Sequence, residues 1–227
     1  PTKKHAMCLA IAWAPPRMHP FLSNPNCFIC ETQFAVFRRP CHCRNCGVCI
    51  CSSCAVQWPS KMLPATYNIK SECVVNICKA CDWLCSTFRL ALLHGDYDKA
   101  IALHATENIN LTTPFANIKG EVLWVVSFVA IIIQSIFSLY IYFSTYFFLN
   151  FNVCFDSYPV HCAVLGGNLS LLRWLIDINC CPLRCIRVGR GGSKATNDIH
   201  TPILTSFKRS LLHIALSNNF IDILRYL

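Results

Sequence analysis

The stretch Cys41-His-Cys43-Arg-Asn-Cys46-Gly-Val-Cys49-Ile-Cys51-Ser-Ser-Cys54 decides the fold of the first part of the chain. It contains the Cys-x-x-Cys pairs Cys43/Cys46 and Cys51/Cys54, and two more such pairs flank it. A thiolate pair of this spacing can bind one side of a tetrahedral Zn²⁺, and two pairs complete a Cys₄ site. Disulfides are the alternative, but regular Cys-x-x-Cys pairs suit metal better. The four pairs predict two structural zinc ions and are Cys27/Cys30, Cys43/Cys46, Cys51/Cys54 and Cys78/Cys81.

The residues around these pairs resemble the FYVE zinc finger. Residues 34–47 read Phe-Ala-Val-Phe-Arg-Arg-Pro-Cys-His-Cys-Arg-Asn-Cys-Gly, which is similar to the basic motif R-[RK]-H-H-C-R-x-C-G of that family. The resemblance covers about residues 23–85 and implies a small α+β finger that two zinc ions cross-brace. A segment this short has little core, so zinc binding is expected to supply its folding free energy. The implied ligands are Cys27, Cys30, Cys51 and Cys54 for one zinc, and Cys43, Cys46, Cys78 and Cys81 for the other.

The resemblance also implies a lipid. FYVE fingers typically bind phosphatidylinositol 3-phosphate on endosomal membranes, and the matching phosphate-binding positions here are Arg39, His42 and Arg44. Pro40 and Cys41 stand where the family has a second basic residue and its first histidine. Each charge-assisted hydrogen bond that is lost in this way is worth about 1.5–3 kcal/mol. We therefore expect weak binding to this lipid, or contact with another anionic membrane surface or a protein.

Further polar side chains near the finger have plainer roles. Cys41, Cys49 and Cys73 are extra thiols, and we expect them to be small buried residues because the four pairs already complete both sites. Arg38 is expected on the solvated surface.

A RING-type ubiquitin ligase is the alternative from the enzyme class, because RING domains also cross-brace two zinc ions. Their third ligand group normally pairs a Cys with a His ahead of another Cys-x-x-Cys. The adjacency of Cys41 and His42 leaves no room for that spacing. We therefore expect no enzymatic activity and assign no catalytic residue.

Beyond the finger, residues 158–163 and 210–215 resemble the T-P-L-H-x-A opening of an ankyrin repeat. Each is followed by a turn and an amphipathic helix, and a more divergent unit begins near Phe88. An unrelated helical hairpin is the alternative. The resemblance implies an all-α array that binds a protein. It also implies that His161 and His213 are structural residues that hydrogen-bond neighbouring backbone.

The spacing of the repeat alanines predicts two insertions. Ala163 and Ala215 lie 52 positions apart, whereas an ankyrin period is about 33 residues, and the excess fits a flexible loop at 180–206. The run 122–155 has no charged residue, Gly or Pro, and it exceeds the roughly 20 apolar residues that span a bilayer. Without this run, the separation between Ala91 and Ala163 falls from 72 to 38, which is close to one repeat.

This apolar run has three interpretations: a translated intron, a transmembrane helix over about 122–149, or a buried core helix. We favour the translated intron. A membrane span would place the two halves of the array on opposite faces of the membrane and separate helices that must pack together. If the span is genuine, the protein is instead anchored in the membrane.

The sequence as a whole predicts a zinc-binding adaptor that is cytoplasmic and peripheral on endosomal membranes. The net charge of +9 is compatible with an anionic membrane surface, and no nucleic-acid partner is expected. Because the chain begins at Pro1 and stops inside a repeat at Leu227, we expect a fragment of a longer protein. The predicted segments are a leader without fixed structure at 1–22, the finger at 23–85, a divergent repeat at 86–121, the apolar insert at 122–155 and further repeats at 156–227.

Overall fold

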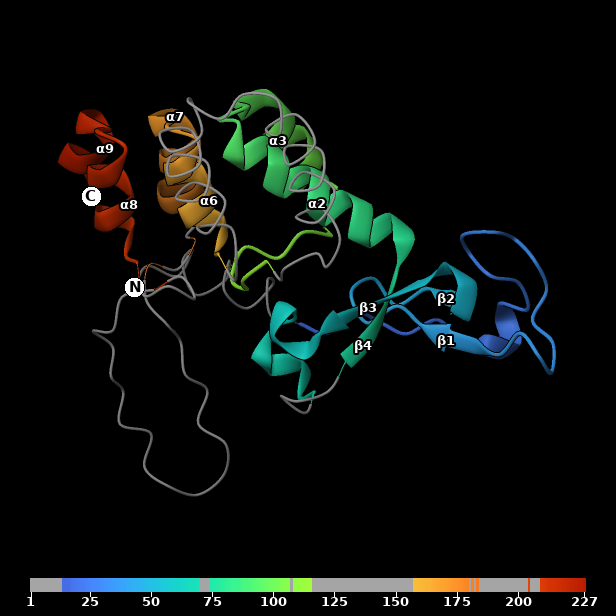
Figure 1. Cartoon of the computed structure of the whole chain (residues 1–227). Helices are drawn as coiled ribbons and strands as arrows, with labels where there is room; N and C mark the ends of the chain where they lie inside the picture. Colours follow the sequence, from blue (N-terminus) through green and yellow to red (C-terminus); the bar gives the residue numbers. More distant parts are fainter. Residues whose placement is uncertain are drawn as a thin grey trace, which may run out of the picture.

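The computed structural model describes residues 14–69, 74–106, 108–115, 157–179, 181, 183, 204 and 209–227. In these residues a small finger lies at one end and a stack of helices extends from it, with α8 and α9 farthest from the finger (Figure 1). The apolar insert 122–155 and all of the loop 180–206 except residues 181, 183 and 204 fall outside the described residues.

Two short antiparallel hairpins form the finger. Strand β1 (Pro40–His42) pairs with β2 (Cys49–Cys51), and β3 (Ala55–Pro59) pairs with β4 (Val74–Cys78). The first hairpin places Pro40 opposite Cys51, and the second places Ala55 opposite Cys78. Single turns of 3-10 helix complete the finger at Phe21–Ser23, Ser52–Cys54, Ser60–Met62 and Ala65–Tyr67.

The core of the finger is small and rich in sulfur. Ile50, Trp58 and Ile77 are its largest buried side chains, and buried cysteines surround them. The indole Nε1 of Trp58 donates to the carboxylate of Asp82 at 2.6 Å, so this bond ties the second hairpin to the helix that follows it.

That helix, α2 (Lys79–Leu93), belongs to both parts of the molecule. Cys78 caps its N-terminus, and Cys81 and Cys85 lie in the finger core, whereas Phe88 and Leu92 lie in the core of the helical stack. The predicted boundary between residues 85 and 86 therefore falls inside one uninterrupted helix. The finger and the first helical unit share this element instead of being joined by a linker.

In the part of the chain that the structure describes, three pairs of helices form the stack. Helix α2 pairs with α3 (Tyr97–His104), and α6 (Pro159–Leu165) pairs with α7 (Leu169–Arg173), which continues as a π-helical segment over Trp174–Ile178. Helix α8 (Leu211–Ser217) pairs with α9 (Ile221–Tyr226). The first helices of the three pairs pack in sequence, α2 against α6 and α6 against α8.

Equivalent positions in the three pairs share the same burial and the same backbone conformation. Ala91, Ala163 and Ala215 are all buried, which lets the helices approach closely. Four residues later, Gly95, Gly167 and Asn219 turn the chain toward the second helix with φ of 66°, 67° and 56°. This left-handed conformation is open to glycine at no steric cost and is tolerated by asparagine. The three pairs are therefore repeats of one structural unit.

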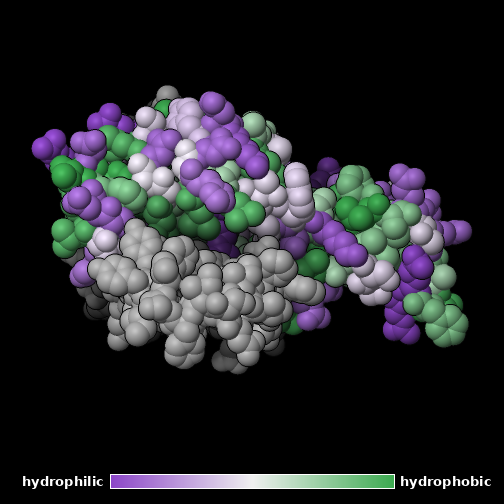
Figure 2. All heavy atoms as spheres, turned by 45° about the horizontal axis from the view of Figure 1, so that its top comes forward, coloured by the Kyte–Doolittle hydropathy of each residue, from purple (hydrophilic) through white to green (hydrophobic). Residues whose placement is uncertain are grey.

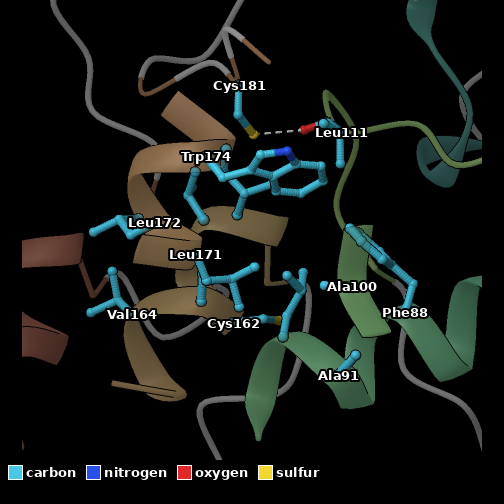
Figure 3. Close-up of a cluster of buried hydrophobic side chains, with 14 of the residues drawn as sticks. Phe88, Ala91, Ala100, Leu111, Cys162, Val164, Leu171, Leu172, Trp174 and Cys181 are labelled. Carbon is cyan, nitrogen blue, oxygen red and sulfur yellow. Dashed lines mark hydrogen bonds between the residues drawn. The ribbon is translucent and has the colours of Figure 1, made fainter. Parts of the chain in front are cut away.

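Side chains and backbone join neighbouring pairs directly. The Asn168 side chain donates from Nδ2 to the Gly95 carbonyl at 2.8 Å, which links the second pair to the first. In the core between the pairs, Cys162 points toward α2 and α3, and Val164 and Leu172 point the opposite way, toward α8 and α9 (Figure 3). The middle pair is thus buried on both sides.

The leader was expected to have no fixed structure over residues 1–22, but part of its second half contacts the finger. The His19 amide donates to the Gly47 carbonyl at 3.0 Å, and the ring of Phe21 stacks on His42 with a centroid separation of 4.0 Å. Arg17, His19 and Phe21 therefore contact the finger, which begins earlier than residue 23. Residues 1–13 lie outside the described residues. Among the helices of the described ranges, none combines the length and hydropathy needed to cross a membrane.

Candidate metal centres

The structure brings the eight paired cysteines together as two tetrads. Within each tetrad, the four sulfur atoms lie within 4.8 Å of one another. Zinc bound to four thiolates has Zn–S bonds of about 2.3 Å, and a tetrahedron with these bonds separates its sulfurs by about 3.8 Å. Cys30 Sγ and Cys51 Sγ are 3.8 Å apart, as are Cys46 Sγ and Cys78 Sγ. The tetrads, which suit two zinc ions, are Cys27, Cys30, Cys51 and Cys54, and Cys43, Cys46, Cys78 and Cys81.

The first tetrad joins the start of the finger to its centre. Cys27 and Cys30 lie in a tight turn that Glu31 closes with a positive φ of 58° and an amide bond to the Cys27 carbonyl. Cys51 ends β2, and Cys54 follows in the adjoining 3-10 turn. The Cys51 amide donates to Cys27 Sγ at 3.3 Å, and a donor of this kind stabilises a thiolate.

The second tetrad joins the first hairpin to the shared helix. Cys43 and Cys46 lie in the turn between β1 and β2, Cys78 ends β4, and Cys81 lies in the first turn of α2. The Cys81 amide donates to Cys78 Sγ at 3.4 Å. The pairs alternate along the chain between the two tetrads, so the sites are cross-braced and neither hairpin can separate without opening one of them.

Gly47 closes the turn that carries Cys43 and Cys46. Its φ is +85°, and its amide donates to the Cys43 carbonyl at 2.8 Å. A Cβ at this position would lie 2.2 Å from the Arg17 carbonyl oxygen. Only glycine meets both requirements without displacing the leader.

The close packing of the sulfur atoms within each tetrad shifts the pKa values of the cysteines. Hydrogen bonds from Cys46, Cys78 and Cys81 hold the pKa of Cys43 far below its ordinary value, and the bond to Cys43 raises the pKa of Cys81. Hydrogen bonds from Thr32 lower the pKa of Cys30 to about 6. Four thiolates in so small a space repel one another, and a divalent cation removes that repulsion while it replaces the shared protons.

The remaining described thiols of the finger are packing residues. Cys49 is buried and its Sγ lies 3.3 Å from the His19 carbonyl, and Cys41 Sγ lies 3.5 Å from the Ile50 carbonyl. Burial raises the pKa of Cys85 to about 12. In the helical stack, the buried Cys181 donates to the Leu111 carbonyl at 3.1 Å (Figure 3). Cys73, Cys180 and Cys185 lie outside the described residues.

The three candidate lipid-binding residues lie in and beside β1. Arg39 precedes the strand and Arg44 lies in the turn after it, and both are exposed. His42 is half-buried, because its ring stacks on Phe21 and its Nε2 lies 2.7 Å from the His19 carbonyl oxygen. That oxygen can only accept, so Nε2 carries the proton and only Nδ1 of His42 faces other partners.

Two features near this strand were not expected from the sequence. Arg38 Nη1 lies 3.9 Å from Cys30 Sγ, so its positive charge adjoins a site whose four thiolates and zinc would carry a net charge of −2. Arg38 also closes a tight turn with Ala35, and this turn carries Val36 and Phe37 at its tip. Val36 is 77% exposed and Phe37 is fully exposed.

The two repeat histidines are structural. The Tyr158 amide donates to His161 Nδ1 at 3.2 Å, and the Ser210 amide donates to His213 Nδ1 at 3.4 Å. Each bond satisfies a backbone donor at the start of a helix, which is the role of a capping box.

A cross-braced finger with two Cys₄ sites is the class of domain that these residues define. Comparison with known families identifies it further: residues 18–87 match the FYVE zinc finger family, so this part of the chain is a FYVE-type finger. A crystal structure of the tandem VHS and FYVE domains of HRS, a protein involved in membrane trafficking and signal transduction, is 30% identical. The match covers 31% of this chain and 29% of that one, with a TM-score of 0.25.

A second similar structure is the LM5-1 FYVE domain from Leishmania major. It is 24% identical, the match covers 31% of this chain and 77% of that one, and the TM-score is 0.25.

Proposed function

We propose that the chain is a non-enzymatic adaptor, in which the finger binds phosphatidylinositol 3-phosphate at a membrane surface and an ankyrin-type array binds a protein. FYVE domains generally bind membranes that contain this lipid, and the finger belongs to that class. The endosomal surface is therefore the proposed location, with the chain bound peripherally.

The observation that carries the membrane proposal is the turn at residues 35–38. Large apolar residues rarely occupy the tip of an exposed turn, because such positions favour small and polar side chains. Here Val36 and Phe37 stand clear of the finger and Arg38 and Arg39 follow them directly. Figure 2 shows apolar and hydrophilic atoms side by side at the end of the finger that faces away from the helical stack.

This arrangement suits the boundary between lipid headgroups and acyl chains. Burying an exposed apolar side chain is worth about 1.5–3 kcal/mol, and an arginine near an anionic surface contributes about 1 kcal/mol. Arg39 and Arg44 are exposed and can contact phosphate, and His42 can add one ring nitrogen. The substitutions at Pro40 and Cys41 remove two family contacts, so the apolar tip would supply a larger share of the affinity.

Binding to vesicles tests this proposal. The full chain would be mixed with vesicles of phosphatidylcholine alone, or with phosphatidylinositol 3-phosphate or phosphatidylserine added to equal charge. We expect preference for the phosphoinositide. Arg39→Ala with Arg44→Ala should abolish that preference, and Phe37→Ala should weaken binding to both anionic vesicles about tenfold or more. Ile178→Ala, an exposed apolar residue in the array, is the matched control.

Equal binding to the two anionic vesicles would contradict a specific lipid site and leave general attraction to negative charge. Binding that survives both the arginine and the Phe37 substitutions would contradict the role of this surface and point to another part of the chain.

The protein-binding half of the proposal rests on the three repeated helix pairs and on the capping bonds of His161 and His213. Cross-linking in cells would compare the wild-type chain with Ala163→Arg, which inserts a charge between the middle helices, and with the surface control Ser170→Ala. We expect the wild-type chain and Ser170→Ala to form the same cross-links to protein, and Ala163→Arg to lose them.

A ubiquitin-transfer assay separates this adaptor from a RING-type ligase, and transfer by the purified chain would contradict the non-enzymatic proposal.

A further inference from the structure

The first zinc site has one exposed corner. Three of its four cysteines, Cys27, Cys51 and Cys54, are buried, whereas Cys30 is exposed. The Cys30 sulfur is therefore the ligand that water and competing chelators reach most easily. Groups that hold and orient a metal ligand affect how tightly the metal binds. A side chain that binds the Cys30 sulfur should thus have a large effect on this site.

Arg38 supplies such a side chain. Its Nη1 lies 3.9 Å from Cys30 Sγ, across eight positions of the chain. Four thiolates and one zinc ion carry a net charge of −2, and the guanidinium offsets part of this charge at the outer side of the site. A hydrogen bond is stronger when its donor or acceptor is ionised, and here both are. Arg38 therefore favours the form of the site in which Cys30 is a metal-bound thiolate.

The next residue along the chain is also an arginine, but its environment differs. Arg38 is half-buried and its guanidinium is directed at the metal site, whereas Arg39 is exposed. Two adjacent residues of the same type and charge thus have separate tasks. Each can serve as the control for the other.

Arg38 also closes the turn that carries the apolar tip of the finger. Its amide donates to the Ala35 carbonyl at 2.9 Å, and its carbonyl accepts from the Ala35 amide at 3.2 Å. Val36 and Phe37 stand between these two residues, and both are exposed. A segment with few buried apolar contacts opens easily unless other bonds hold it. The bond from Arg38 to Cys30 ties this turn to the metal site.

We propose that Arg38 is a positioning residue of the first zinc site, and that through Arg38 the bound ion also fixes the turn at residues 35–38. The zinc ion holds the Cys30 thiolate, this thiolate holds the guanidinium, and the guanidinium holds the end of the turn. The use of the turn at a membrane rests on the proposed function. The link between the turn and the metal site does not.

The zinc affinity of the full chain tests the first link. Competition with a chromophoric chelator would compare the wild type, Arg38→Gln and Arg39→Gln, which loses the same charge from the adjacent position. We expect Arg38→Gln to bind one of its two zinc ions about tenfold less tightly, which is the lower end of the usual loss when a group that orients a metal ligand is removed. Arg39→Gln should match the wild type. Arg38→Lys keeps the positive charge and should retain most of the affinity.

Cadmium NMR identifies the site that is affected. The chain loaded with Cd²⁺ in place of zinc should give one resonance from each tetrad. Arg38→Gln should shift only one of the two resonances, because loss of the hydrogen bond changes the electron donation of Cys30 alone. A general loosening of the finger would move both.

The second link is measured on the backbone of the turn. Amide order parameters of Val36 and Phe37, from nitrogen NMR relaxation of the zinc-saturated chain, report motion on the picosecond to nanosecond timescale. We expect them to fall in Arg38→Gln and to stay at wild-type values in Arg39→Gln.

Equal zinc affinities of Arg38→Gln and Arg39→Gln would overturn the proposal, as would equal shifts of both cadmium resonances or unchanged order parameters in Arg38→Gln. A loss of affinity in Arg38→Lys as large as in Arg38→Gln would also overturn it, since the charge would then not be what holds the sulfur. None of these measurements involves lipid, so their failure is distinct from failure of the vesicle experiment.

Discussion

The backbone amide of Phe115 donates to the carbonyl oxygen of Ser157 at 3.0 Å, although 41 residues separate the two in the chain. The chain therefore leaves the described fold at Phe115 and re-enters it beside the same residue. A segment that crossed a bilayer once would part its two ends by about 30 Å. The hydrogen bond between Phe115 and Ser157 therefore argues against a single membrane crossing between these two residues.

Deletion of residues 122–155 is expected to leave the helical stack intact. The remaining residues between Phe115 and Ser157 form a loop of ordinary length for a connection in a compact domain. The shortened protein should be soluble and helical, with cooperative thermal unfolding by circular dichroism. Sequencing of the transcript should show Glu121 joined to about Asp156–Tyr158, as expected of a translated intron.

Two results would contradict this prediction. Mature transcripts could encode the run and the protein could resist carbonate extraction from membranes, which would indicate a genuine membrane segment. Alternatively, the deletion could abolish cooperative unfolding, which would indicate that the run is part of the core.

Removal of zinc should unfold the finger. Elemental analysis should find two zinc ions per chain, and excess chelator should abolish the near-ultraviolet circular dichroism signal of the finger, because metal binding supplies the folding free energy of so small a core. Cys43→Ser should have the same effect as the chelator, since it opens the second tetrad.

Cys49→Ser is the matched control. Cys49 lies in the same short stretch and is buried, but its sulfur contacts the His19 carbonyl and belongs to neither tetrad. We expect two zinc ions to remain bound. One zinc ion or none in the wild-type chain would contradict the cross-brace.

The cysteine tetrads follow from the sequence because each Cys-x-x-Cys pair fixes its own local turn. The pattern contains no comparable signal for the leader, whose contact with Gly47 depends on a backbone hydrogen bond from His19 across 28 positions. The same holds for His42: its ring nitrogen Nε2 donates to the His19 carbonyl, and a motif read along β1 cannot reveal a partner that lies 23 positions earlier in the chain.

The shared helix shows a second limit of the sequence. Cys85 packs in the finger and Phe88 packs in the stack, yet no Pro or Gly marks the change between them, and only Ser86 and Thr87 intervene. The motif ends near residue 85, but the helix continues, because its apolar positions merely rotate from one core to the other. Sequence motifs locate the chemistry here more accurately than they locate the ends of structural units.

The close approach of the first two pairs predicts a sensitive position at Gly166. Its φ of −68° suits any residue, but a Cβ would lie 2.2 Å from the Leu92 carbonyl oxygen. Gly166→Ala must therefore push α6 away from α2, and we expect a loss of about 1–3 kcal/mol in the free energy of unfolding. Urea denaturation measures this loss. Ser170→Ala, on the exposed side of α7, should change stability little, and equal stability of both variants would contradict the close contact.

The stability of the stack should fall in acid because of His104. Its ring lies 5.1 Å from Trp174 and 6.3 Å from Phe88, and burial among these rings lowers the pKa of His104. In the unfolded chain a histidine has a pKa of about 6.5, so the unfolded state binds the proton more readily than the folded state. The contribution of His104 to the free energy of unfolding is therefore fully present above a pH of about 6.5. This contribution is lost as the pH falls below the unfolded-state pKa. Urea midpoints at pH 7.5 and 5.5 would be compared for the wild type, for His104→Gln and for the exposed control His94→Gln. We expect His104→Gln to have a smaller acid-induced loss than the other two, and an equal loss in all three would show that protonation of His104 does not destabilise the stack.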